Sequence, residues 1–129
     1  MNSTEKRDAD SFHEVLDYRI VTREDGFVRL EMTAYDCHRQ RGRFIHGGVL
    51  MSLMDIAGIH AGLRAAGEAR DGVTVSLNCN FLAVAKSARV FAEGRLLRKG
   101  RSMFFSECRV IDAETDNLLA TAQGVFKYL

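Results

Sequence analysis

No stretch of the 129-residue chain is apolar for long enough to cross a membrane. The most apolar stretch, around Leu53, is interrupted by Ser52, Asp55 and His60, whereas a membrane-spanning helix needs about 18 to 20 apolar residues. The first residues, MNSTEKRDADSF, also lack the apolar segment of a secretory signal. We therefore expect a soluble protein with no membrane partner and with a polar tail over residues 1–14.

Cysteine is scarce, and neither sign of charge predominates. The chain has 3 cysteines and no Cys-x-x-Cys pair, which argues against a zinc site or a redox couple and favours free thiols in the cytoplasm. Its 18 basic and 17 acidic side chains give no basic surface for nucleic acid, so we expect no nucleic-acid partner. With 47% hydrophobic residues, residues 15–129 are expected to fold as one domain.

The pattern of apolar residues predicts an α+β fold. Alternating residues on both sides of Asp25-Gly26 predict a hairpin, and the apolar residues of Gly48–Leu63 occur on every side of a helix, which predicts that protein surrounds it. Short connections between the later strands favour antiparallel neighbours. We expect a curved antiparallel sheet wrapped around one long helix, with four strands after the helix at residues 73–82, 89–97, 103–111 and 118–126.

The first strand after the helix alternates strictly between apolar and polar residues. Alternation of this kind places successive side chains on opposite faces of a sheet. Thr74 is therefore expected on the polar face, with Ser76, Asn78 and Asn80, and opposite the apolar set Val73, Val75, Leu77, Cys79 and Phe81.

Asp55 lies in the middle of the predicted helix, with no lysine or arginine between Arg43 and Arg64. A buried carboxylate without a partner costs several kcal/mol and responds by raising its pKa. Such a group suits a general base or a nucleophile. The alternative is structural: an arginine or backbone amides from elsewhere in the fold would satisfy it.

The sequence His46-Gly47-Gly48 comes directly before that helix. The first helical turn offers free N–H groups, and glycine lets another molecule approach them, so the amides could hold the oxyanion of an acyl group under attack. The alternative is an ordinary turn with a capping histidine. Gly47 and Asp55 are eight residues apart, about 12 Å along a helix, so one carbonyl group cannot contact both. An enzyme would need two antiparallel copies, a homodimer with two shared sites.

Three segments resemble one known family, the hotdog-fold acyl-CoA thioesterases, and in particular the group that includes the phenylacetate-pathway and 4-hydroxybenzoyl-CoA enzymes. The segments are HGGVLMSLMDIAG, GVTVSLNCNFLAVAK and RKGRSMFFSECRVID. The resemblance implies a hotdog fold, hydrolysis of an acyl-CoA substrate to a free acid and CoA, no cofactor, and a homotetramer built as a dimer of dimers. It also points to aromatic acyl groups such as phenylacetyl.

The resemblance assigns roles by position. Asp55 would be the catalytic carboxylate, as general base or nucleophile, and Gly47 would supply the oxyanion amide. His46 would orient or polarise the thioester, and Gln40 matches an Asn or Gln of the family. Thr74 matches a Ser or Thr that positions the attacking water in some members.

Two further positions are assigned to substrate binding, and two depart from the family pattern. Gly48 would line the substrate, and Arg101 would contact a CoA phosphate. Ile59 stands where some relatives have a hydroxyl, and Val84 stands where many have proline.

Other functions stay open on the sequence alone. A hotdog dehydratase or hydratase would combine a histidine and an acid in a different motif, and a non-catalytic acyl-CoA-binding module would bind without hydrolysis. No metal site is expected, because His46, Asp55 and His60 cannot converge from one straight helix.

Overall fold

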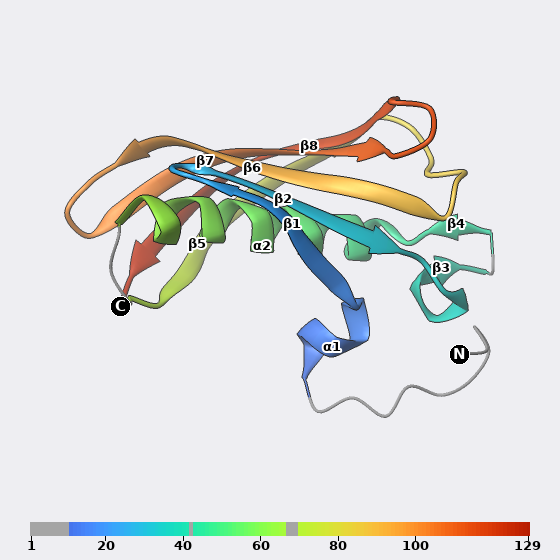
Figure 1. Cartoon of the computed structure of the whole chain (residues 1–129), viewed down its shortest axis with the longest axis horizontal. Helices are drawn as coiled ribbons and strands as arrows, with labels where there is room; N and C mark the ends of the chain where they lie inside the picture. Colours follow the sequence, from blue (N-terminus) through green and yellow to red (C-terminus); the bar gives the residue numbers. More distant parts are fainter. Residues whose placement is uncertain (1–10, 42, 67–69) are drawn as a thin grey trace.

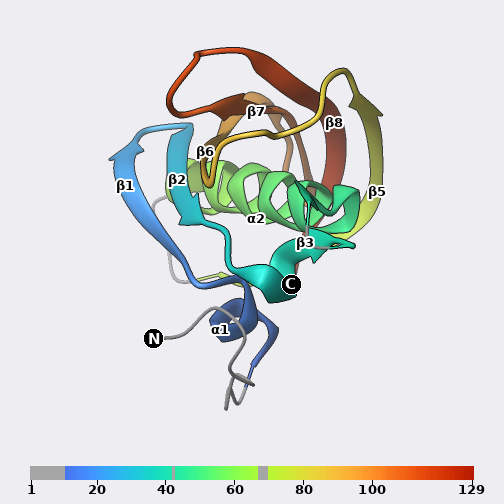
Figure 2. The ribbon, with the colours of Figure 1, turned by 90° about the vertical axis from the view of Figure 1, so that its right-hand side faces the viewer.

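The protein consists of one long helix held in a curved sheet (Figure 1). The computed structural model describes residues 11–41, 43–66 and 70–129. Figure 2 shows the sheet curving over the long helix α2 and down along both of its sides. The elements in chain order are α1 (Phe12–Leu16), β1 (Tyr18–Glu24), β2 (Phe27–Thr33), the 3-10 helix η1 (Asp36–His38), β3 (Arg39–Gln40), β4 (Phe44–Ile45), α2 (Gly47–Ala66), β5 (Gly72–Phe81), β6 (Arg89–Lys99), β7 (Met103–Asp112) and β8 (Leu118–Tyr128).

Six strands form the main sheet, in the order β1-β2-β6-β7-β8-β5, and every neighbouring pair is antiparallel. This confirms the predicted α+β fold and the four strands after the helix. The hairpin at Asp25-Gly26 is also confirmed, with Gly26 at φ 74°, a conformation that suits glycine. Strands β1 and β5 are the two edges of the sheet.

The helix packs very closely on the middle of the sheet. A Cβ atom on Gly94 would lie 2.2 Å from the Ala57 carbonyl oxygen, so only glycine allows β6 to approach α2 this far. Two buried hydroxyls add polar contacts to the helix backbone: Ser106 donates to the Gly58 carbonyl (2.9 Å) and Tyr128 donates to the Gly62 carbonyl (3.0 Å). The position of α2 on the sheet is therefore fixed by both packing and hydrogen bonds.

One side of α2 is not covered by the sheet. Leu53, Met54 and Ala57 are fully buried, whereas Met51 is 41% exposed and Asp55 is half-buried. The prediction that protein surrounds the helix is therefore wrong for a single copy of the chain. Its open side carries the acid.

The predicted face of Thr74 is wrong, because β5 contains a bulge at Val75. Thr74 pairs with Phe126, and the next regular pair after the bulge is Ser76 with Val125. Paired residues share a face of the sheet, and Phe126 is fully buried against α2, so Thr74 also faces the helix. The extra residue shifts the alternation, and Thr74 shares its face with Leu77 and not with Ser76.

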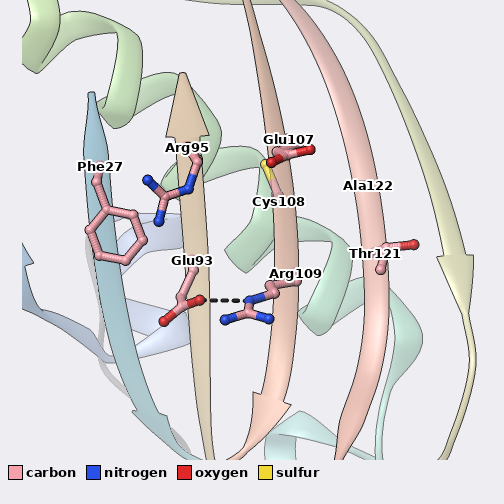
Figure 3. Close-up of a pocket in the computed structure, with 8 residues that line it drawn as sticks. All are labelled: Phe27, Glu93, Arg95, Glu107, Cys108, Arg109, Thr121 and Ala122. Atoms are coloured by element: carbon pink, nitrogen blue, oxygen red, sulfur yellow. Dashed lines mark hydrogen bonds and ion pairs between the residues drawn. The ribbon is translucent and has the colours of Figure 1, made fainter. Parts of the chain in front are cut away.

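The outer face of the sheet is charged. A shallow pocket there is lined by Phe27, Glu93, Arg95, Glu107, Cys108, Arg109, Thr121 and Ala122, and α2 lies on the opposite side of the sheet (Figure 3). Glu93 is buried and accepts hydrogen bonds from Arg29 (2.8 Å) and Arg109 (2.7 Å) on the flanking strands. No predicted site residue lines this pocket.

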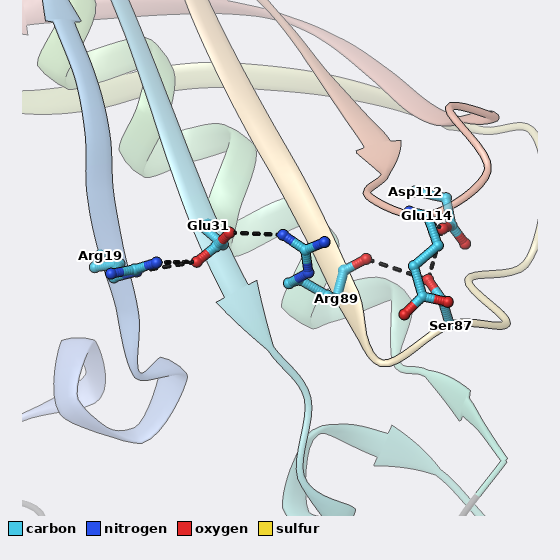
Figure 4. A network of polar contacts seen from close by, with 6 residues as sticks. All are labelled: Arg19, Glu31, Ser87, Arg89, Asp112 and Glu114. Carbon is cyan, nitrogen blue, oxygen red and sulfur yellow. Dashed lines mark hydrogen bonds and ion pairs between the residues drawn. The ribbon is translucent and has the colours of Figure 1, made fainter.

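A second polar network lies near the ends of β1, β2 and β6 (Figure 4). Glu31 forms ion pairs with Arg19 (2.6 Å) and Arg89 (3.0 Å), and these hydrogen bonds hold the pKa of Glu31 below its usual range. Ser87 donates to Asp112 (2.6 Å), which also accepts from backbone amides of the β7–β8 turn. These contacts fix strand ends and turns.

The first described element is the short helix α1. Ser11 caps its start by accepting from the Glu14 amide, and Leu16 is buried in the core. The boundary expected at residue 14 falls inside this helix, while residues 1–10 of the expected tail lie outside the described residues.

Candidate active site

Asp55 lies in the middle of α2, and its partner is a hydroxyl. The Thr74 hydroxyl donates to Asp55 Oδ1 at 2.5 Å, from the edge strand β5. Among the side chains that the structure describes, no lysine, arginine or histidine forms an ion pair with Asp55. The second carboxylate oxygen accepts no hydrogen bond from any described residue.

Two cysteines lie in the field of this carboxylate. Cys79 and Cys108 flank Ala122 from the two neighbouring strands, on the face of the sheet toward α2. Burial and then the charge of Asp55 raise the pKa of Cys79, and the same causes raise the pKa of Cys108 to about 12. Both thiols are therefore neutral near pH 7, which makes them poor nucleophiles.

His46 caps the start of α2. Its Nδ1 accepts a hydrogen bond from the Gly48 amide (2.8 Å), and its own backbone N–H donates to the His38 carbonyl (2.8 Å). An accepting Nδ1 requires the tautomer that carries its proton on Nε2. The exposed ring therefore keeps one N–H donor for an outside group.

Gly47 and Gly48 differ in how their amides are used. The Gly48 N–H is satisfied by His46, whereas no described residue accepts from the Gly47 N–H. The Gly47 backbone has no positive φ, and a Cβ there would lie 3.5–3.8 Å from the ring of Phe81, an ordinary contact. Neither the backbone conformation nor the local space requires glycine at position 47.

His38 is a supporting residue that the sequence did not reveal. Its ring is buried; Nδ1 accepts from the Tyr35 amide (2.9 Å), and Nε2 donates to the Val15 carbonyl (2.6 Å). Since its carbonyl accepts from His46, it connects α1 to the start of α2. In the sequence of a polar loop, a buried histidine that links two elements cannot be told apart from a solvent-exposed one.

The other predicted site residues lie at different distances from the helix start. Gln40 is exposed on β3, which pairs with β4 just before α2. Arg101 is exposed in the turn between β6 and β7, and Figure 1 shows this turn at the end of the molecule opposite the start of α2. A single copy therefore does not bring Arg101 to Gly47.

The remaining residues form two separate groups along α2 and β5, which run in opposite directions. One group is Asp55 with Thr74, and the other is His46 and Gly47 with Phe81. Because eight residues of helix separate Gly47 from Asp55, the two groups lie about 12 Å apart along its axis.

Known proteins share both this fold and this sequence pattern. Residues 42–118 match the profile described as the Thioesterase superfamily. A Saccharolobus solfataricus protein, whose name gives esterase as a provisional activity, is 34% identical over 82% of this chain and 75% of its own. A conserved Pseudomonas aeruginosa protein has a TM-score of 0.85 at 29% identity, covering 94% of this chain and 95% of that one.

Zebrafish thioesterase superfamily member 2 has a TM-score of 0.84 at 25% identity, covering 95% of this chain and 88% of that one. The single long helix in a six-stranded antiparallel sheet is thus a hotdog fold. The family profile covers more than half of the chain, including the helix that carries Gly47 and Asp55. The chain therefore belongs to the Thioesterase superfamily.

Proposed function

We propose that the protein is an acyl-CoA thioesterase, which hydrolyses an acyl-CoA to a free acid and CoA. The observation that carries the proposal is the Asp55 carboxylate, bound in mid-helix by the Thr74 hydroxyl at 2.5 Å. A carboxylate with one oxygen held and the other open is suited to accept a proton from water. The neutral thiols of Cys79 and Cys108 leave that role to the carboxylate.

In the proposed reaction, water attacks the thioester carbon and gives a proton to Asp55. The carbonyl oxygen becomes an oxyanion, which accepts from the Gly47 N–H, and the Nε2–H of His46 is a second possible donor. The intermediate then collapses: the C–S bond breaks, and the CoA sulfur takes the proton from Asp55. Gln40, on β3 beside the helix start, positions the substrate.

The proposed active unit is a homodimer, because one copy separates its two groups of site residues. Strand β5 is an edge, and its exposed apolar residues Val73 (43%) and Val75 (55%) favour pairing with a second copy. An antiparallel pairing about an axis close to Asn78 would bring Thr74 of one copy near Phe81 of the other. Each site would then join Asp55 and Thr74 to the second copy's Gly47. Two such dimers would form the homotetramer that the family resemblance implies.

The proposed substrate is anionic, and the start of α2 is positively charged. Arg39, Arg41 and Arg43 lie on or beside the β3–β4 turn, next to His46. Cations there attract a phosphate-bearing substrate such as CoA. We retain aromatic acyl groups such as phenylacetyl among the proposed substrates.

The experiment measures thiol release from acetyl-, hexanoyl-, phenylacetyl- and benzoyl-CoA. Asp55→Asn is expected to lower kcat by at least about 100-fold, because it removes the proton acceptor. Asp116→Asn is the matched control: Asp116 is exposed in a turn at φ 63°, a conformation that asparagine tolerates. Full activity in a folded Asp55→Asn protein would refute the proposal, as would a wild-type protein that hydrolyses none of the four thioesters.

A further inference from the structure

Phe81 is an exposed aromatic residue in contact with Gly47, the proposed oxyanion-binding residue. Three atoms of its ring lie 3.5, 3.7 and 3.8 Å from where a Cβ of Gly47 would stand. Despite this contact, Phe81 is 49% exposed. One part of the ring therefore packs on the helix start, and the other part is available to a bound molecule.

The backbone around Phe81 is firmly held. Phe81 is the last residue of β5 and pairs with Ala120 of β8. The next two amides, of Leu82 and Ala83, both donate to the Leu119 carbonyl, at 2.8 and 3.2 Å. The ring is therefore carried on a fixed strand end, and a bound group would meet it in a defined position.

The position of the ring determines which part of a substrate it can touch. A carbonyl oxygen bound to the Gly47 N–H would place the atoms attached to that carbonyl carbon beside the ring. The chain after Phe81 carries no charged residue until Lys86, and Val84 within it is 49% exposed. The arginines lie instead on the β3–β4 turn, which suits the phosphate-bearing arm. The acyl chain, and not the CoA arm, thus fits the Phe81 side.

We propose that Phe81 is a specificity-determining residue: its ring forms the wall against the acyl carbons next to the thioester carbonyl. This inference rests on the proposed thioesterase function. Because the ring lies against Gly47, it would also keep water from one side of a bound oxyanion, which strengthens the hydrogen bond from the Gly47 N–H. A branched carbon next to the carbonyl meets the ring, whereas a linear or flat group passes along it.

The test compares Phe81→Ala, Phe81→Tyr and the control Leu82→Ala on acetyl-CoA and isobutyryl-CoA. Phe81→Ala is expected to lower kcat for acetyl-CoA about tenfold and to raise the isobutyryl-to-acetyl ratio of kcat/KM about tenfold, as for other changes of pocket size. Phe81→Tyr keeps the ring and is expected to retain the wild-type ratio. Leu82 is the next residue, beyond the end of β5 and 57% exposed, and the atoms nearest to a Cβ at Gly47 belong to Phe81 and not to Leu82, so Leu82→Ala is expected to change neither value.

The outcomes separate the inference from the function on which it rests. If the wild type is active, Asp55→Asn is inactive, and Phe81→Ala gives the same kcat and ratio as Leu82→Ala, the inference is wrong and the proposed function stands. If the wild type hydrolyses no acyl-CoA, both are wrong. Because Phe81 is half exposed, Phe81→Ala is expected to fold, and its Tm is measured beside that of Leu82→Ala.

Discussion

At the residue scale, the hydrogen bond from Thr74 to Asp55 links the edge strand to the acid of the helix. The hydroxyl fixes one carboxylate oxygen, and in doing so it orients the other. A water molecule near Asp55 can also donate to the Thr74 oxygen, which has lone pairs to spare. In the proposed reaction, Thr74 would therefore act on the attacking water in two ways.

Replacing Thr74 with valine removes the hydroxyl at nearly constant shape. A hydrogen bond to a charged group contributes about 1.5–3 kcal/mol, so kcat of Thr74→Val is expected to fall about 10- to 100-fold. Thr74→Ser keeps the hydroxyl and is expected to stay within a few-fold of the wild type. Steady-state kinetics of the two variants check this, and equal kcat values for Thr74→Val and Thr74→Ser would contradict it.

The two glycines at the start of α2 are expected to respond differently to alanine. At Gly47 a methyl group meets only ordinary contacts, so Gly47→Ala is expected to keep the wild-type Tm within a few degrees. The same variant is expected to lose activity, because the methyl group blocks the approach of the thioester to the amide. At Gly48 a Cβ would lie 3.0 Å from Nδ1 of His46, so Gly48→Ala is expected to displace the capping ring and lower the Tm. Thermal unfolding and kcat, measured on both variants, separate the two effects. A wild-type kcat in Gly47→Ala would show that no substrate approaches this amide.

At the element scale, the outer face of the sheet is stabilised by carboxylates placed between arginines of neighbouring strands. Burial alone would raise the pKa of Glu93, but hydrogen bonds from Arg109 and Arg29 outweigh it and hold the pKa below the usual 4.5. A carboxyl group with a lowered pKa in the folded state stabilises the fold above its unfolded pKa. That contribution is lost as the pH falls through the folded pKa.

Glu93→Gln is therefore expected to lower the free energy of unfolding by about 1–3 kcal/mol at pH 7. The difference from the wild type is expected to persist down to about pH 5 and to shrink below the usual carboxyl pKa of 4.5. Urea unfolding of both proteins between pH 3 and 7 measures it. Glu107→Gln is the control on the same face, because Glu107 forms no ion pair with any described residue. A difference that is constant over the whole pH range would exclude the charged pairs as its cause.

The long elements could be predicted from the sequence because their patterns are long. Helix α2 and the last three strands were expected from their apolar residues, and the structure extends each of them by one to four residues. The short elements α1 (Phe12–Leu16) and η1 (Asp36–His38) span five and three residues, too few for a periodic pattern. Their positions depend instead on tertiary contacts, such as the buried ring of His38.

The candidate site was predictable in its residue types but not in its geometry. A mid-helix acid after His46-Gly47-Gly48 is visible in the sequence, whereas the contact between Thr74 and Asp55 depends on the bulge at Val75. A bulge adds one residue to a strand, and the alternation of apolar and polar residues does not reveal where. The prediction from the sequence therefore put Thr74 on the wrong face. Phe81 is one of several strand aromatics, and only its contact with Gly47 distinguishes it.

At the scale of the whole molecule, one copy of the chain holds the residues proposed for the chemistry in two groups, one around Asp55 and one around Gly47. A rigid helix cannot bend to bring Gly47 to Asp55, which lie about 12 Å apart along its axis. In the proposed dimer, a second copy would pair with the edge strand β5 beside the open side of α2 and would complete both groups. The two-fold symmetry of such a dimer would give it two equal sites.

A shared site can be tested by mixing two inactive variants. Asp55→Asn damages one group and Gly47→Ala damages the other, so each variant alone is expected to be inactive. When equal amounts are refolded together, half of the dimers are mixed, and each mixed dimer has one site with both groups intact; the activity is expected to return to about a quarter of the wild-type value. The control is each variant refolded alone, with size-exclusion chromatography to confirm equal assembly. Activity of the mixture no higher than the sum of the separate variants would show that each site is formed within one chain. Gly47 and Asp55, about 12 Å apart on one helix, would then not act together on one carbonyl group, and another residue would have to take the role of one of them.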